Sequence, residues 1–310
     1  KVPGTPDGPA RDGAPPMRIG IFGGAAIDQG LDAVRRAAAG AETEGFASFW
    51  LPQIFGLDAL AALTLIGAET PRIELGTAVV PTYPRHPITL AAQALTVQAA
   101  SSGRLTLGIG LSHQFVIEAM FGYSFDRPAR HMEEYLRALV PLLAGAQADV
   151  DGETVRAHAQ ITVPGTSAPS LLVAALGPRM LQITAERADG TITWMTGPRT
   201  LGEFTVPTIR AAAEQAGRPE PRVAVGLPIC VTDDPDGARA RAAQIFEVYG
   251  HLPSYRAMLD REGAAGPADV ALVMAVPGDR RSIFVLPFEE AAFTFIGTTD
   301  TAYDGSLDEP

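Results

Sequence analysis

The sequence contains a single cysteine, Cys230, only one lysine and no asparagine among its 310 residues. One cysteine excludes an intramolecular disulfide framework and a zinc site built from thiolates, and it fits a reducing compartment. No apolar run reaches the roughly 18 residues needed to span a bilayer, and the first residues lack the apolar core of a signal peptide. We therefore predict a cytoplasmic protein. Cys230 itself lies within an apolar run and is expected to be a buried small hydrophobe rather than a nucleophile.

Positive charge is scarce as well. The chain has 24 Lys and Arg residues against 35 Asp and Glu residues, a formal net charge of −11, and its arginines form no cluster. Such a balance repels phosphate backbones and anionic lipid. We therefore expect no nucleic-acid or membrane partner. The expected partner is a small-molecule substrate, and the expected oligomer is a homodimer.

Residues 1–16 are rich in proline and glycine and hold one large apolar residue, Val2. Such a segment cannot bury enough surface to fold alone. We interpret it as a disordered lead or tag, with Met17 as the natural start.

From Met17 onward, short apolar runs alternate with longer alanine-rich stretches of helical period. This alternation is typical of βα units on a parallel sheet. Seven units, with an insertion-like stretch over 148–169, favour an α/β fold of the TIM (β/α)8 barrel type over an open doubly wound sheet. An eighth unit is needed for closure. The predicted strands are 19–23, 48–52, 73–80, 105–111, 170–176, 190–195 and 223–231, and the predicted helices are 30–44, 58–68, 90–100, 130–143, 178–187, 201–216 and 235–249.

The active site of such a barrel lies at the C-terminal ends of its strands. There the sequence offers glycines, small residues and few charges, without metal-ligand spacing, a nucleophile elbow or paired acids. A wide, uncharged cup suits a planar ring cofactor that carries its own reactivity. At residues 176–180 a strand passes into a helix through glycine and proline, so free helix amides and Arg179 would hold a phosphate. An ordinary βα turn explains the same spacing equally well.

Several separated motifs resemble the bacterial luciferase-like superfamily, beginning with Arg85-His86-Pro87 and the SSGR run at 101–104. More narrowly, residues 17–273 are similar to an actinobacterial branch of oxidoreductases that use the deazaflavin coenzyme F420. The motifs that carry this resemblance are LGTAVVPTYPRHP (75–87), GIGLSH (108–113), VAALGPRML (173–181), ADGTITWMTGP (188–198), GLPICVTDD (226–234) and YGHLPSYRAMLDREGAAGPADVALV (249–273).

The resemblance implies a luciferase-like TIM barrel and hydride transfer between C5 of the deazaflavin and a small organic substrate. It also implies a cofactor phosphate near the helix after strand five, and a non-prolyl cis peptide near residues 76–78 that supports the ring. Coenzyme F420 is the expected cofactor, FMN is the alternative, and no metal is expected. The implied cofactor-binding residues are Gly76, Thr77, Ala78, Gly110, Ser112, Ala174, Ala175, Leu176, Gly177, Pro178, Arg179, Met180 and Trp194.

Two side chains near strand ends are candidates for catalysis. His113 follows the fourth strand, and an unperturbed pKa near 6.5 permits proton transfer at cellular pH; the alternative is a hydrogen bond to cofactor phosphate or backbone. Gln53 stands where related enzymes often carry a histidine or an acid. It can orient a carbonyl but cannot transfer a proton at neutral pH. Because of this departure, a non-catalytic cofactor-binding protein remains an alternative, beside an FMN-dependent monooxygenase or reductase.

The superfamily resemblance also includes Arg127, Arg130 and Glu134. These residues stand at the spacing of a helix start, where oppositely charged neighbours interact. We predict an ion-pair network there rather than contact with a ligand.

The C-terminal segment departs from the luciferase-like pattern after residue 273. Residues 276–310 resemble instead a fragment of FAD-dependent glycerol-3-phosphate dehydrogenases, but the chain holds no GxGxxG nucleotide fold, so that activity is not expected. We predict that the tail, 274–310, supplies the closing strand from 282–286, with 291–296 pairing nearby, and that the junction arose by a gene fusion or frame change. The alternative is an open barrel with an exposed strand edge.

Overall fold

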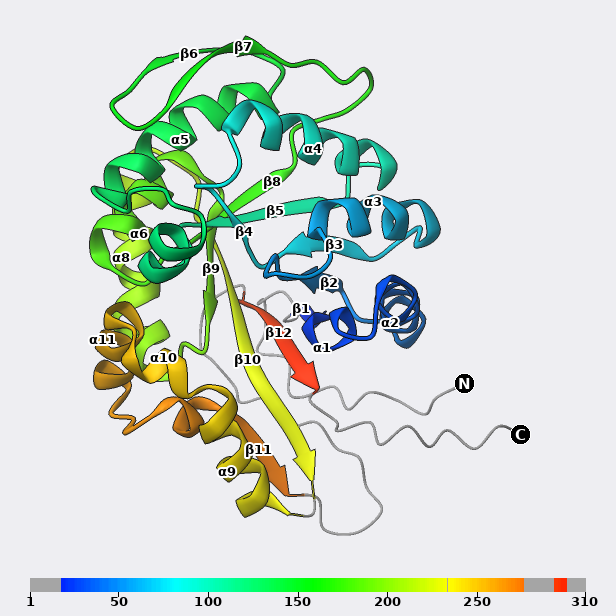
Figure 1. Ribbon diagram of the computed structural model, residues 1–310, viewed down its shortest axis with the longest axis vertical. Helices are drawn as coiled ribbons and strands as arrows, with labels where there is room; N and C mark the ends of the chain where they lie inside the picture. Colours follow the sequence, from blue (N-terminus) through cyan, green and yellow to red (C-terminus); the bar gives the residue numbers. More distant parts are fainter. Residues whose placement is uncertain (1–17, 233, 276–292, 300–310) are drawn as a thin grey trace.

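The computed structural model describes residues 18–232, 234–275 and 293–299. Within these ranges, eight parallel strands pair in a closed ring in which each strand contacts the next and the last returns to the first (Figure 1). The predicted α/β TIM barrel is therefore confirmed. In ring order the strands are β1 (Arg18–Phe22), β2 (Ser48–Leu51), β3 (Glu74–Thr77), β5 (Leu105–Gly110), β8 (Ser170–Ala174), β9 (Gly190–Trp194), β10 (Arg222–Thr232) and β12 (Phe293–Thr299).

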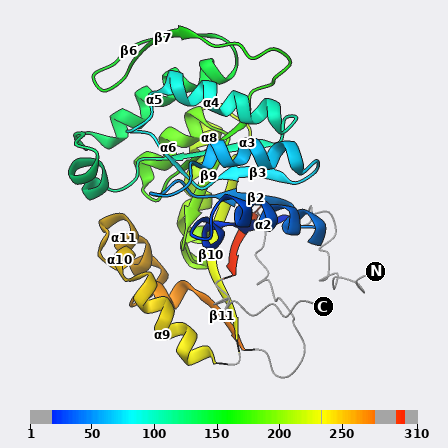
Figure 2. The same cartoon turned by 45° about the vertical axis from the view of Figure 1, so that its right-hand side comes forward.

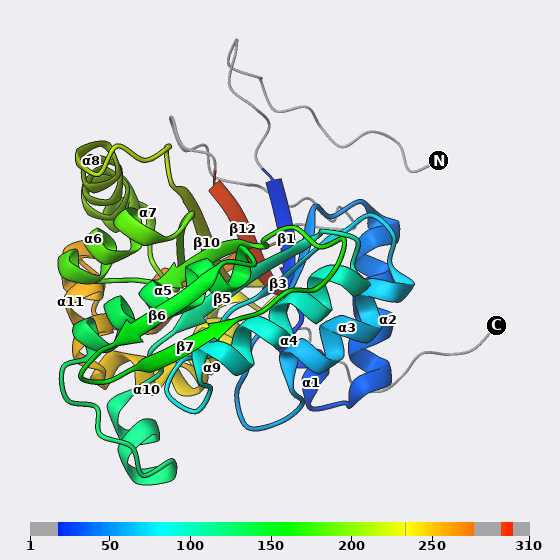
Figure 3. The same ribbon diagram turned by 90° about the horizontal axis from the view of Figure 1, so that it is seen from above.

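Helices surround the ring (Figures 1 and 3) and bury apolar residues against it. Their limits follow from local signals: Asp58 caps the helix that begins at Ala59 by accepting a hydrogen bond from Ala61 N at 2.9 Å, and Gly45 ends another in the left-handed region. The main core lies between strands and helices. The surrounding helices are α2 (Leu31–Glu44), α3 (Ala59–Glu69), α4 (Pro87–Ala100), α5 (Pro128–Leu143), α6 (Pro178–Arg187) and α8 (Val206–Gln215). Shorter pieces are α1 (Gly24–Ile27), α7 (Pro198–Thr200) and the π-helical turns Val116–Met120 and Leu201–Thr205.

The predicted strand at 73–80 is interrupted. After β3 the chain passes through a cis peptide bond between Ala78 and Val79 and continues as β4 (Val80–Pro81), which pairs with β5. The Thr77 hydroxyl donates to Gly108 O at 2.7 Å and accepts from Gly108 N at 2.8 Å, so it replaces the missing ladder contacts. The cis peptide implied by the family resemblance is confirmed, at the Ala78–Val79 bond.

The insertion-like stretch at 148–169 contains an antiparallel hairpin, β6 (Gln147–Asp151) and β7 (Arg156–Gln160). It packs on the outer side of α5 and α4 (Figures 1 and 3). Its position outside the helix layer explains why it interrupts the βα alternation without disturbing the ring.

A separate group of helices follows β10: α9 (Pro235–Ile245), α10 (Glu247–His251) and α11 (Pro253–Glu262). Figure 2 shows this group apart from the helices that encircle the barrel. The predicted helix at 235–249 breaks at Phe246, which caps both α9 and α10. A 3-10 turn (Pro267–Val270) and β11 (Leu272–Ala275), parallel to the end of β10, complete the segment.

Glu262 fixes this helical group to the barrel. Its carboxylate accepts hydrogen bonds from Arg199 N at 3.1 Å and Thr200 N at 2.8 Å. These are free amides at the start of α7, where negative charge is favoured. The group also has its own apolar cluster, with Met258 and Leu259 packed on Met195.

Strand β12 lies between β10 and β1. It overlaps the predicted pairing segment 291–296, whereas the predicted closing strand 282–286 and the predicted lead 1–16 lie outside the described residues. The division of the chain at 16 and 273 stays a prediction.

The barrel interior is filled by Trp50, Leu172, Ile192 and Ala224. Trp50 is fully buried, and its indole N–H donates to Ser48 Oγ at 2.8 Å. A Cβ atom at Gly76 would lie 2.1 Å from the Trp50 ring. Gly76 is therefore required for packing around Trp50.

We expect Gly76→Ala to lower the free energy of unfolding by about 1–3 kcal/mol, because the methyl group overpacks the barrel interior. Chemical denaturation measures the change. The matched control is Gly40→Ala in α2, where an added Cβ meets nothing within 4 Å; it should stabilise by about 0.5–1 kcal/mol. Equal stability of Gly76→Ala and the unmodified chain would contradict the packing role.

Candidate active site

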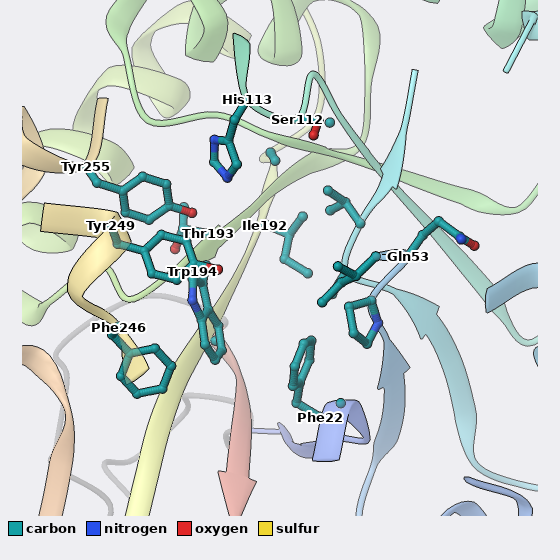
Figure 4. Close-up of a pocket in the computed structure, with 18 of the residues that line it drawn as sticks. Phe22, Gln53, Ser112, His113, Ile192, Thr193, Trp194, Phe246, Tyr249 and Tyr255 are labelled. Carbon is teal, nitrogen blue, oxygen red and sulfur yellow. The ribbon is translucent and has the colours of Figure 1, made fainter. Parts of the chain in front are cut away.

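A cavity of about 1040 Å³ opens at the C-terminal ends of the strands. Its walls come from the strand ends on one side and from α9–α11 on the other (Figure 4). Phe22 and Gln53 lie on the barrel side, while Tyr249 and Tyr255 project from the helical group. The cavity therefore lies where the fold class predicts an active site.

The loop between β3 and β4 forms part of one wall through Ala78 and Val79. Gly76 and Thr77, predicted to bind cofactor, do not line the cavity. Gly76 packs on Trp50, and the Thr77 hydroxyl is engaged by Gly108. Both support the wall from behind in this structure, and their direct contact with cofactor stays a prediction.

The turn from β8 into α6 forms a second part of the wall. Ala174, Ala175, Leu176, Gly177 and Met180 all line the cavity. Gly177 is the N-cap of α6, and no side chain caps the amides there. An added Cβ at Gly177 would meet nothing within 4 Å, so space is open beside these amides.

Pro178 and Arg179 lie outside the cavity wall, although both were predicted to bind cofactor. Pro178 occupies the first turn of α6. The Arg179 guanidinium turns away to Glu133, at 3.1 Å, and to Gln182, also at 3.1 Å. In this structure Glu133 pairs with the Arg179 charge, and the phosphate contact by Arg179 stays a prediction.

Gly110, Ser112 and His113 reach the cavity from the end of β5. Ser112 has a positive φ of 64°, which turns the chain so that the His113 ring projects into the cavity (Figure 4). The ring lies near Phe115, at a centroid distance of 6.0 Å, and near Tyr255, at 6.2 Å. Burial lowers the pKa of His113 below 6.5, so the imidazole is mostly neutral at pH 7.

The Gln53 side chain lies at the barrel side of the cavity, but its oxygen is already used. It accepts a hydrogen bond from Ala59 N at 2.8 Å, at the start of α3. Arg85 lies 3.5 Å from the same oxygen and pairs with Asp58. In Figure 4 the amide points away from the cavity. In this structure Gln53 accepts a hydrogen bond at the start of α3, and its catalytic role stays a prediction.

Trp194 forms the floor on the side of the helical group. Its ring stacks on Phe22 at 5.2 Å and meets Phe246 edge-on at 6.2 Å. Trp194 thus lies where the sequence placed it, at a strand end in the cavity wall, whereas Trp50 is entirely core.

Thr193, Tyr249 and Tyr255 line the cavity and were not singled out in the sequence. The two tyrosines lie in the motif at 249–273 that carries part of the family resemblance, and this motif is the sequence feature that could have pointed to them. Cys230 also lines the cavity and is only partly buried, so its predicted full burial is wrong.

The family model described as luciferase-like monooxygenase matches residues 14–307. The chain belongs to this family. Among curated relatives, 5,10-methylenetetrahydromethanopterin reductase of Methanolobus tindarius is 31% identical over 268 residues, which cover 84% of this chain and 81% of the relative. A putative coenzyme F420-dependent oxidoreductase of Mycobacterium tuberculosis is 27% identical over 249 residues, with coverage of 75% and 70%.

A solved F420-dependent secondary alcohol dehydrogenase, in complex with an F420-acetone adduct, shares the luciferase-like fold. Its TM-score is 0.72 at 16% identity, with 93% of this chain and 96% of that chain covered. At this identity the likeness establishes the fold alone.

The luciferase-like match also covers β12 and most of the tail. The match thus extends past residue 273, where the quoted motifs end. The similarity of 276–310 to a dehydrogenase fragment and the gene-fusion hypothesis stay predictions.

The part of this luciferase-like chain that the structure describes holds no group of three His, Cys, Asp or Glu residues placed to bind a metal ion. None of the described helices combines the length and hydropathy required to cross a membrane.

Proposed function

We propose that the protein is a coenzyme F420-dependent oxidoreductase that transfers a hydride between C5 of the deazaflavin and a small organic substrate. The observation that carries the proposal is the largely apolar cavity at the strand ends, into which the uncapped start of α6 opens. The F420-dependent relatives support the choice of cofactor.

The residues present fit such a cofactor. Ala78, Val79 and Ile192 offer flat apolar surface for a ring. The Thr193 hydroxyl is buried and has no hydrogen-bond partner among the described residues, so it is available to a polar ring atom or to substrate. The free amides after Gly177 would hold a phosphate.

When bound here, a deazaflavin supplies a hydride acceptor or donor and no acid–base group for the substrate. The chain supplies that group. His113 projects into the cavity from the barrel side, and an imidazole can both donate and accept a proton. We assign it the proton that accompanies the hydride.

Fluorescence titration of the purified protein with coenzyme F420 and with FMN tests the proposal. We expect saturable binding of the deazaflavin. Tight FMN binding without a response to the deazaflavin would refute the F420 proposal in favour of an FMN-dependent monooxygenase or reductase. Deazaflavin binding without turnover across a broad substrate panel would indicate a non-catalytic binding protein.

Replacing Gly177 by aspartate is expected to weaken F420 binding about tenfold or more. The carboxylate would cap the α6 amides that otherwise face the phosphate, and its charge would repel that phosphate. The titration above measures the effect. Gly177→Ala, which adds a Cβ into open space, is the matched control and should bind F420 nearly normally. Unchanged affinity of Gly177→Asp would place the phosphate elsewhere.

We also propose that the protein acts as a homodimer, which analytical ultracentrifugation would test.

A further inference from the structure

A buried hydroxyl group lies on the helical side of the cavity without a partner. Thr193 is 3% exposed, and its Oγ1 makes no hydrogen bond within the described part of the chain. Buried hydroxyl groups in native proteins are nearly always paired. Since Thr193 lines the cavity, a bound molecule is the available partner.

Two phenols face the same region. Tyr249 and Tyr255 project into the cavity from α10 and α11 (Figure 4), with ring centroids 4.8 Å apart. The His113 ring lies 6.3 Å from the first and 6.2 Å from the second. Burial raises the pKa of both phenols, and the Trp194 indole partly opposes the rise at Tyr249. Both therefore stay protonated and remain hydrogen-bond donors at neutral pH.

Among the residues that the structure describes, the cavity interior offers no unpaired charge. Asp28, Arg85 and Arg241 are the charged residues in its wall. Asp28 and Arg241 are exposed to water, and Arg85 pairs with Asp58. A charged ligand would lose its hydration without gaining a counter-ion in the interior, which is costly.

The mouth of the cavity is apolar. Ile54, Phe55, Phe115 and Phe121 stand in its wall and are 63%, 62%, 51% and 42% exposed. Apolar side chains this exposed at a cavity entrance mark a surface that an apolar ligand would cover.

We propose that the substrate is an uncharged, largely apolar molecule with a single carbonyl or hydroxyl oxygen, and that the Tyr255 and Thr193 hydroxyls bind this oxygen beside His113. This inference rests on the proposed function, since the carbon that bears the oxygen is the one that exchanges the hydride. In the reducing direction that carbon gains the hydride, the oxygen gains a proton and an alcohol forms, while the deazaflavin is oxidised.

Protection from thermal unfolding tests the proposal without requiring turnover, because a molecule that binds the folded protein raises its melting temperature. The protein is melted in the presence of increasing concentrations of cyclohexanone or of cyclohexanecarboxylate, a charged probe of similar size. Cyclohexanone should raise the melting temperature in a concentration-dependent way, and the carboxylate should not.

Tyr255→Phe and Thr193→Val should each weaken protection by cyclohexanone about fivefold, since each removes one hydrogen bond. Tyr123→Phe, at an exposed tyrosine outside the cavity wall, is the matched control and should leave it unchanged. Thermal melts check that all three variants fold. Equal protection by the carboxylate, no protection by cyclohexanone, or unchanged protection in both Tyr255→Phe and Thr193→Val would overturn the proposal.

The same experiment, repeated with coenzyme F420 present, separates the two proposals. Cyclohexanone protection that depends on Tyr255, in a protein that does not bind F420, would refute the proposed function and leave the oxygen-binding site standing. F420 binding without any cyclohexanone protection would refute the oxygen-binding site alone.

Discussion

Replacing Glu134 by alanine is expected to lower the free energy of unfolding by about 3 kcal/mol. The carboxylate is 4% exposed and accepts hydrogen bonds from Glu153 N at 3.1 Å, Thr154 N at 2.8 Å and Val155 N at 3.2 Å. The Thr154 hydroxyl donates to it at 2.7 Å. Alanine would leave these donors, which hold the turn between β6 and β7 against α5, without their acceptor. Urea unfolding measures the loss.

The adjacent Glu133 provides the control. It lies on the same helix but is half-exposed, and it pairs with Arg179 at 3.1 Å and Arg187 at 3.8 Å. Exposed ion pairs contribute little, so Glu133→Ala should cost less than about 1 kcal/mol. Equal losses in the two variants would show that Glu134 is no more than a surface charge.

The contribution of Glu134 should also depend on pH. Burial alone would raise its pKa, but the hydrogen bonds from Thr154, Glu153 and Val155 together hold it below the ordinary value of 4.5. A carboxyl group whose pKa is lower in the folded state stabilises the fold above its unfolded pKa and loses this contribution as the pH falls. The stability difference between the unmodified chain and Glu134→Ala should therefore be full above pH 4.5 and shrink on acidification below it.

Glu134 also shows which interactions could be predicted from the sequence and which could not. Its spacing from Arg127 and Arg130 predicted an ion-pair network, and Arg130 does lie 3.8 Å from Glu134 and 3.4 Å from Glu153. The stronger interaction, with backbone amides of the hairpin, could not be predicted because it joins segments about twenty residues apart. Spacing along one helix carries no information about a turn that packs against it.

The barrel itself was largely predictable because each βα unit repeats a local pattern. Apolar runs matched the ring strands from β1 to β10, and the predicted helix at 58–68 agrees with the helix that Asp58 caps. The break between β3 and β4 and the split of α9 from α10 depend on contacts with other elements. Hydrophobic periodicity alone predicted one continuous strand at 73–80 and one continuous helix at 235–249.

The candidate site was predictable where it follows the strand ends and not where it depends on side-chain direction. His113, Gly177 and Trp194 reach the cavity because strand ends of a barrel converge. Arg179 turns to Glu133 instead. Tyr255 reaches the cavity from α11, a helix that follows β10 in the chain and packs beside the strand ends. No local sequence signal predicts where α11 packs.

Replacing His113 by alanine should reduce the rate of hydride transfer about 10²- to 10⁴-fold while coenzyme F420 still binds, because the variant loses the side chain assigned to proton transfer. Stopped-flow measurement of deazaflavin reduction or oxidation with a turned-over substrate separates this loss from weaker binding. Tyr123→Phe, at an exposed tyrosine outside the cavity wall, is the control and should retain the rate. An unchanged rate in His113→Ala, with cofactor bound, would refute the assignment.

The direction of the pH profile follows from the surroundings of His113. Among the described residues, the titratable groups whose rings contact the His113 ring are the Tyr249 and Tyr255 phenols, which stay neutral. Burial lowers the pKa of the imidazole below 6.5. As a proton donor His113 must be protonated, so substrate reduction should accelerate as the pH falls below 6.5. Substrate oxidation requires the neutral base and should be fully active above that pH. The pH dependence of reduction and that of oxidation should both disappear in His113→Ala, because the remaining phenols around the cavity do not titrate in this pH range.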